Sequence, residues 1–151
     1  KLSVRENITL SSLDLFSRLG IISRKREESG AESFIQQLRI KTPGHGQKVF
    51  NLSGGNQQKV VLAKWLSSKA DIFIFDEPTR GMDVGSKVEI YQLMNQLTAE
   101  GVAIIMISSE LPEILGMSDR ILIMHQNAIA GEFHAGEATQ ELVMRTALGA
   151  T

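Results

Sequence analysis

The chain has 151 residues, 42% of them hydrophobic, which is enough to bury the core of one domain or of the larger part of one. Its formal net charge of −1 argues against broad nucleic-acid binding driven by phosphate neutralisation. The absence of cysteine rules out a disulfide framework and thiolate metal sites, and favours an intracellular protein. The longest apolar run, Val102 to Ile107, is far shorter than the roughly 20 residues that span a bilayer.

The first forty residues have a helical pattern. Ser3 to Glu6 has the spacing of a capping box, and Phe34, Ile35 and Leu38 recur at helical intervals. The charged run Arg24 to Glu28 could touch a protein partner or lipid headgroups, but we interpret it as a solvated helix face.

A Ser-Gly-Gly turn follows residues 41–51, whose proline and glycines predict a loop. Ser53 is predicted to be the N-cap of a helix that continues through Leu66. Unpaired amides and the helix dipole favour an anion at such an N-terminus, so a terminal phosphate fits at Ser53, Gly54 and Gly55.

Three amide side chains, Asn56, Gln57 and Gln58, occupy the first turn of that helix. The tripeptide at 53–55 taken alone is equally an ordinary capped turn. The amides are unusual for a mere cap, and they add hydrogen-bond donors near the same anion. The whole stretch therefore favours phosphate binding.

After this helix the pattern changes to short apolar runs. Ile72 to Phe75 and Val102 to Ile107 are expected to be strands buried on both faces of a parallel sheet. The segment Val84 to Leu97 predicts a helix between them, and strand-helix-strand is an α/β unit.

The C-terminal third predicts a hairpin and a final helix. Ile121 to Met124 and Ala128 to Phe133 flank the turn residues Gln126 and Asn127, and Glu137 to Leu148 has a helical pattern.

Two adjacent carboxylates follow the first predicted strand. The carboxyl ends of strands are where α/β sheets place ligands. Mg²⁺ prefers carboxylate and water oxygens, so Asp76 is predicted to hold the metal through water. Glu77 is suited to orient or deprotonate an attacking water. If the Asp-Glu pair stood alone in the sequence, we would interpret it as two acidic residues in a solvated loop.

The order of these motifs resembles the ABC ATPase family. "LSGGNQQ" is similar to its signature motif, "IFIFDE" to its Walker B strand with the catalytic glutamate, and Gly81-Met82-Asp83 to its D-loop. The resemblance implies an α/β, P-loop NTPase-like (RecA-like) core with a parallel sheet, and ATP and Mg²⁺ as cofactors. It also implies an α-helical subdomain over residues 1–68 and the C-terminal part of the core over residues 69–151. The ATP-binding residues it implies are Ser53, Gly54, Gly55, Asn56, Gln57 and Asp83.

A closer resemblance is to the second ATPase domain of ribose- and galactose-type sugar importers, through stretches such as "DEPTRGMDVGSK" and "ISSELPEILGMSDRI". It implies a second ATPase domain as a partner, transmembrane permease subunits and, indirectly, a periplasmic sugar-binding protein, with no nucleic acid. The implied location is cytoplasmic, peripheral on the inner face of the membrane.

The P-loop that such an ATPase needs is not in this sequence, because none of the 13 glycines is followed by lysine. The chain also begins with Lys1, so we expect a truncated segment that is inactive alone. By the resemblance, its signature motif serves ATP held by a partner domain. Two alternatives are a non-catalytic interaction domain and the corresponding lobe of a chromosome-maintenance ATPase, which the lack of upstream heptads disfavours.

The resemblance departs at Ser109, where family members usually have a switch histidine. Serine cannot carry the positive charge that histidine can offer to a γ-phosphate. The histidines present, His45, His125 and His134, are expected on the surface or in the hairpin. Ser109 therefore predicts a degenerate switch position and a slow site at Glu77. Trp65 is expected to pack in the core.

Overall fold

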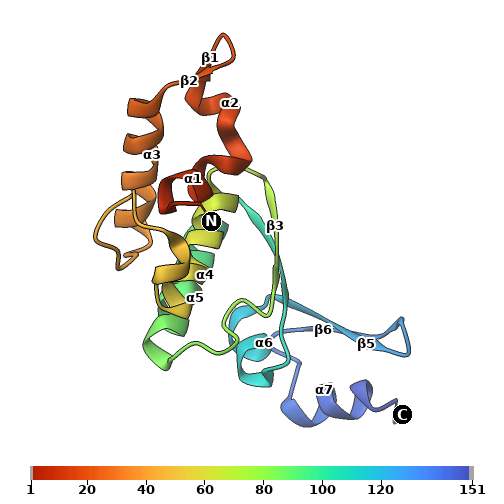
Figure 1. Ribbon diagram of the computed structural model, residues 1–151. Helices are drawn as coiled ribbons and strands as arrows, with labels where there is room; N and C mark the ends of the chain where they lie inside the picture. Colours follow the sequence, from red (N-terminus) through yellow and green to blue (C-terminus); the bar gives the residue numbers. More distant parts are fainter. Residues whose placement is uncertain (1, 150–151) are drawn as a thin grey trace. The chain divides into compact units, whose positions relative to one another are not determined.

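The computed structural model describes residues 2–149 (Figure 1). The chain divides into two compact units. The first contains the chain up to Phe73 together with Gly81–Ala103, and the second contains Ile74–Arg80 with the chain from Ile104 onward. The division runs through strands β3 (Ile72–Asp76) and β4 (Ala103–Ile107). The domain boundary expected near residue 68 remains a prediction.

The first unit is mainly helical. Helix α1 packs against α3 and α4, and Val4, Ile8, Ala31, Val60 and Ala63 are buried in its core. Its elements are α1 (Val4–Thr9), a 3₁₀ turn (Leu10–Ser12), α2 (Leu13–Phe16), β1 (Ser17–Arg18), β2 (Ile21–Ile22), α3 (Arg24–Gln37), a 3₁₀ turn (Val49–Asn51), α4 (Gly54–Leu66) and α5 (Val84–Ala99). The short β1–β2 hairpin lies in a region predicted to be wholly helical.

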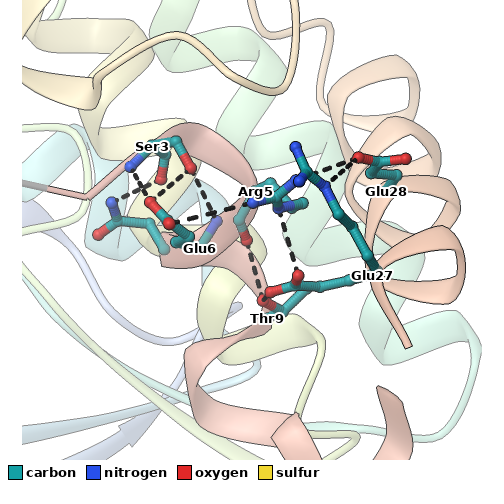
Figure 2. A network of polar contacts seen from close by, with 8 residues as sticks. Ser3, Arg5, Glu6, Thr9, Glu27 and Glu28 are labelled. Atoms are coloured by element: carbon teal, nitrogen blue, oxygen red, sulfur yellow. Dashed lines mark hydrogen bonds and ion pairs between the residues drawn. The ribbon is translucent and has the colours of Figure 1, made fainter. Parts of the chain in front are cut away.

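A polar network joins α1 to α3 (Figure 2). The capping box predicted at Ser3 and Glu6 is present, with both reciprocal hydrogen bonds formed. Beside it, the Arg5 guanidinium lies 3.2 Å from the Glu27 carboxylate and 3.1 Å from that of Glu28. The Thr9 hydroxyl donates a 2.7 Å hydrogen bond to Glu27.

The prediction of a solvated face for residues 24–28 is therefore wrong for Glu27, which is buried. A buried carboxylate is stable only when it is paired and hydrogen-bonded. Arg5 and Thr9 of α1 supply those partners.

The β3–β4 pair carries the α/β part of the chain. Hydrogen bonds from Ala103 N to Asp71 O and from Glu77 N to Ile107 O advance along both strands in the same direction, so the strands are parallel. The expectation of strands buried on both faces is wrong. Side chains alternate between faces, and Ile72, Ile74, Ile105 and Ile107 are exposed because the described residues cover only one face of this pair.

The second unit contains α6 (Leu111–Met117), β5 (Arg120–His125), β6 (Ala128–His134) and α7 (Gln140–Ala147). Strands β5 and β6 form the predicted antiparallel hairpin. Its turn residues Gln126 and Asn127 have φ of 47° and 62°, as the favoured two-residue hairpin turn requires. Ile121, Ile123 and Val143 form the core between the hairpin and α7.

Trp65 does not pack in the core as expected. Its side chain is 51% exposed, and the Lys64 ammonium lies 4.3 Å from the ring centroid. The predicted helix is correct, but Trp65 lies on its exposed side.

Candidate functional site

The Ser-Gly-Gly turn begins α4 as predicted, with Ser53 at the N-cap position. The Ser53 hydroxyl does not cap the helix; instead it accepts a 2.8 Å hydrogen bond from the Asn56 side-chain amide. The side-chain oxygen of Asn56, Oδ1, in turn accepts a 2.7 Å hydrogen bond from the Lys41 backbone N–H. The Ser53 side chain therefore leaves the N-terminal amides of α4 uncapped.

The Gln57 side chain is also used locally. Its amide donates a 2.8 Å hydrogen bond to the Leu52 carbonyl oxygen. Asn56 and Gln57 thus fix the shape of the turn, whereas the sequence suggested amide groups directed at an anion.

Neither glycine of the turn is required by packing against the described residues. Among the described residues, no atom lies within 4 Å of where a Cβ at Gly54 would stand, and at Gly55 the nearest atom is Ser86 Oγ at 3.9 Å. Neither has the positive φ that would require glycine. The smooth backbone at these two positions is therefore available for close approach by an external group.

Asp83 caps α5 beside this turn. Its carboxylate accepts hydrogen bonds from the Ser86 backbone N–H at 3.0 Å and from the Ser86 hydroxyl at 2.7 Å. The Ser86 hydroxyl, with the Ser86 N–H second, lowers the pKa of Asp83 below its ordinary value. Asp83 therefore stays charged in mildly acidic solution.

The starts of α4 and α5 open into one cavity of about 420 Å³. It is lined by Lys41, Ser53, Gly55, Asn56, Lys59, Asp83, Gly85, Ser86 and Glu89. The structure thus brings together four of the predicted residues, Ser53, Gly55, Asn56 and Asp83, while Gly54 and Gln57 do not line the cavity.

Sequence reasoning missed the Lys59–Glu89 ion pair at this cavity. The Lys59 side chain is nearly buried, and its ammonium also lies 3.4 Å from the Arg39 carbonyl oxygen. The two residues are 30 positions apart, so no local pattern could have indicated the pair.

In the second unit, the backbone of Glu77 adopts the left-handed conformation, with φ of 47°. Its N–H donates to the Ile107 carbonyl oxygen at 2.9 Å, which fixes this strained residue at the end of β3. Ser109 follows Ile107 by two residues and is exposed, as is Asp76. The predicted catalytic residues therefore lie at the ends of two neighbouring strands.

A buried carboxylate, missed by sequence reasoning, supports this edge. Glu113 accepts hydrogen bonds from the Thr79 hydroxyl and, at 2.8 Å, from the Ser108 hydroxyl. The Ser108 hydroxyl also accepts from the Glu110 N–H at 3.0 Å. Thr79 follows β3 and Ser108 follows β4, so one side chain of α6 connects both loops.

The carboxylates at this edge do not form a complete metal cage. Among residues 2–149, no three histidine, cysteine or acidic side chains are grouped to hold a metal ion. Mg²⁺ commonly keeps several waters and uses one or two carboxylates, so Asp76 alone fits that smaller donor set.

A separate finding concerns the membrane. The part of the chain described here contains no helix long and apolar enough to cross a membrane.

The sequence profile of the ABC transporter family matches residues 1–80. The chain belongs to this family. It is 58% identical over 147 residues to the ribose import ATP-binding protein of Bacillus subtilis, covering 97% of this chain and 30% of that protein. It is 57% identical over 148 residues to the xylose import ATP-binding protein of Thermoanaerobacter pseudethanolicus, covering 98% of this chain and 29% of that protein. The chain thus spans about 30% of the length of these relatives.

Solved ABC transporter cassettes share the fold. A dimeric bacterial cassette superposes with a TM-score of 0.75 at 23% identity, covering 89% of this chain and 57% of that one. Another ATP-binding cassette superposes with a TM-score of 0.79 at 21% identity, and the match covers 99% of this chain and 62% of that one. The α/β, P-loop NTPase-like fold class predicted from the sequence is confirmed.

Proposed function

We propose that this chain is part of an ATP-binding, ATP-hydrolysing subunit that powers sugar import. The observation that carries the proposal is the paired start of α4 and α5 at one cavity, with two glycines that this fold does not itself require. The relatives named as ribose and xylose import ATP-binding proteins support the sugar class.

In this proposal the first unit contacts ATP that is held by the P-loop of a second ATPase domain. Unpaired amides at the start of α4 and the smooth backbone of Gly54 and Gly55 suit a terminal phosphate. Ser53 offers its hydroxyl, and Asn56 and Gln57 hold the turn that presents it. Asp83, charged and held by Ser86, lies at the same cavity.

The second unit serves a different nucleotide. Asp76 would hold Mg²⁺ through water, which supplies charge neutralisation for the phosphates. Glu77 would orient the attacking water from its constrained backbone position. Ser109 occupies the switch position without the charge of a histidine, so this site is the slower of the two.

Permease subunits would receive the helical subdomain, residues 1–68, and a periplasmic sugar-binding protein would deliver the sugar to them. Residues 69–151 would be the C-terminal part of the ATPase core. The subunit would then lie on the cytoplasmic face of the membrane.

ATP turnover of the assembled transporter tests the assignment of roles. Ser53→Ala should reduce ATP turnover by about tenfold or more, because Ser53 contacts the ATP held by the second ATPase domain, which is the faster of the two sites. Glu77→Gln, which keeps the shape of the side chain, should reduce it by a smaller factor because its site is already slow. Equal, full activity of both variants would refute the assigned roles, and a larger loss with Glu77→Gln would refute the asymmetry.

A further inference from the structure

The β1–β2 hairpin exposes three large apolar side chains. Leu19 is 95% exposed, Ile21 75% and Ile22 48%. Figure 1 shows the hairpin at one end of the helical region, beyond α2 and the start of α3. Leu19 and Ile21 therefore lie mostly in solvent, where burial within the first unit stabilises them little.

The backbone at the tip is also unfavourable for its sequence. Leu19 has φ of 53° and Gly20 has φ of 78°, so both turn residues are left-handed. Asn-Gly is the favoured pair for this turn, and a left-handed leucine costs roughly 1–2 kcal/mol. Because folding would be served better by a small polar residue, a bulky leucine at this position points to a role outside the fold.

Basic residues surround the apolar tip. Arg18, Arg24, Lys25 and Arg26 are all exposed, and residues 15–26 contain no acidic residue. The nearest carboxylates along the chain are Asp14, Glu27 and Glu28; Glu27 is buried and paired with Arg5, and Glu28 is paired with Arg24 and Arg5. The hairpin is thus strongly basic in a chain whose net charge is −1.

Helix stability does not explain these cations. Lys25 and Arg26 lie in the first turn of α3, where the helix dipole disfavours positive charge. Neither makes a salt bridge recorded within the described residues, whereas Arg24 pairs with Glu28 at 3.0 Å.

The hairpin is held firmly on its support. Ser17 pairs with Ile22 and Arg18 with Ile21, and the Ser23 N–H donates to the Phe16 carbonyl oxygen at 2.8 Å. The apolar tip is therefore fixed next to the start of α3, whose first three residues are Arg24, Lys25 and Arg26.

We propose that this hairpin surface, Arg18 to Ile22 with Lys25 and Arg26, binds the surface of an anionic lipid bilayer. Aliphatic side chains suit the acyl boundary, while lysine and arginine attract phosphate headgroups. A protein partner is less suited, because lysine is depleted in protein interfaces and the tip has no aromatic anchor. The proposal goes beyond the proposed function, since it requires neither ATP nor a permease.

Vesicle co-sedimentation of the purified protein alone tests the binding. Vesicles of phosphatidylcholine with a quarter phosphatidylglycerol should bind it, and vesicles of phosphatidylcholine alone should bind it weakly. Lys25→Gln with Arg26→Gln should weaken binding about thirtyfold, because each basic residue at such a surface strengthens it about fivefold. The exposed pair Lys69 and Arg145 provides the matched control, and Lys69→Gln with Arg145→Gln should change binding less than twofold.

A second variant tests the apolar tip without endangering the fold. Leu19→Asn with Ile21→Thr gives the turn its preferred residue, so folding should be retained while vesicle binding falls about tenfold or more. Because the chain has no cysteine, Leu19→Cys also allows one environment-sensitive dye at the tip. Its emission should shift to the blue on anionic vesicles, while a dye at the exposed position Ala99→Cys should not shift.

Three results would overturn the proposal. One is equal binding to neutral and anionic vesicles. Another is a loss of vesicle binding in the Lys69 and Arg145 control variant as large as that in the Lys25 and Arg26 variant. The third is no vesicle binding by the protein alone while the hairpin variants abolish binding to a reconstituted permease, which would assign the surface to a protein partner.

Discussion

Thr79 donates a hydrogen bond from its hydroxyl to the carboxylate of Glu113, and both side chains are almost completely buried. Thr79 lies two residues after Glu77, and Glu113 also accepts from Ser108, which precedes Ser109. The loops that carry the two predicted catalytic residues are therefore connected through one carboxylate. Glu113, to which the sequence motifs assigned no role, therefore supports the position of Glu77 relative to Ser109.

Thr79→Val should destabilise the protein by about 1–3 kcal/mol, because it replaces a donor to a buried carboxylate with a methyl group. Thr79→Ser keeps the hydroxyl and should cost clearly less. Urea unfolding followed by circular dichroism measures both. If the serine variant were the less stable of the two, packing of the methyl group rather than the hydrogen bond would explain the role of Thr79.

Gly54→Ala and Gly55→Ala should leave the free energy of unfolding within about 1 kcal/mol of the parent, or raise it, because alanine favours a helix and finds space at both sites. In the assembled transporter the same variants should lose ATP turnover by about tenfold or more, since the added methyl meets the approaching nucleotide. A large loss of stability would show that the glycines serve the fold. Unchanged turnover would contradict their place in the site.

Gly30→Ala should destabilise the protein by about 1–3 kcal/mol although it lies within helix α3. A Cβ there would stand 2.5 Å from Cε1 of the Phe16 ring, so the added methyl must displace it. Gly116→Ala in α6 is the matched control, because nothing among the described residues lies within 4 Å of its Cβ position. It should instead stabilise the protein by up to about 1 kcal/mol.

A double-mutant cycle separates the cause of this effect. In a Phe16→Ala background, Gly30→Ala should become neutral or stabilising, because the clash is removed. Persistent destabilisation in that background would rule out contact with Phe16 as the reason for glycine at position 30.

Ser86→Ala should raise the pKa of Asp83 toward its ordinary value, because the Ser86 hydroxyl is the largest cause of the lowering. The folded pKa of Asp83 lies below the unfolded value. Its contribution to stability is therefore present above the unfolded pKa and is lost as the pH falls through the folded pKa. Carboxyl-carbon NMR titration measures the shift. Asp83→Asn, which preserves an N-cap residue, should remove this pH dependence without removing the cap.

The sequence by itself determined the family and most of the local elements, although it did not indicate the β1–β2 hairpin or helix α6. Apolar runs, capping residues and turn residues act over a few positions, so the α4 start, the strands β3 and β4 and the hairpin at Gln126–Asn127 could be predicted. The motifs also identified the ABC ATPase resemblance, which the family match confirms. Their order along the chain was sufficient for that conclusion.

Only the tertiary structure decided which distant residues meet. The burial of Glu27 depends on Arg5, and the role of Glu113 depends on Thr79. Lys59 forms an ion pair with Glu89, which is 30 positions away in the sequence. Such contacts depend on how helices pack, and no local pattern encodes them. The exposed isoleucines of β3 and β4 also depend on tertiary structure. An apolar run predicts a strand, but it does not predict how many faces of that strand neighbouring segments cover.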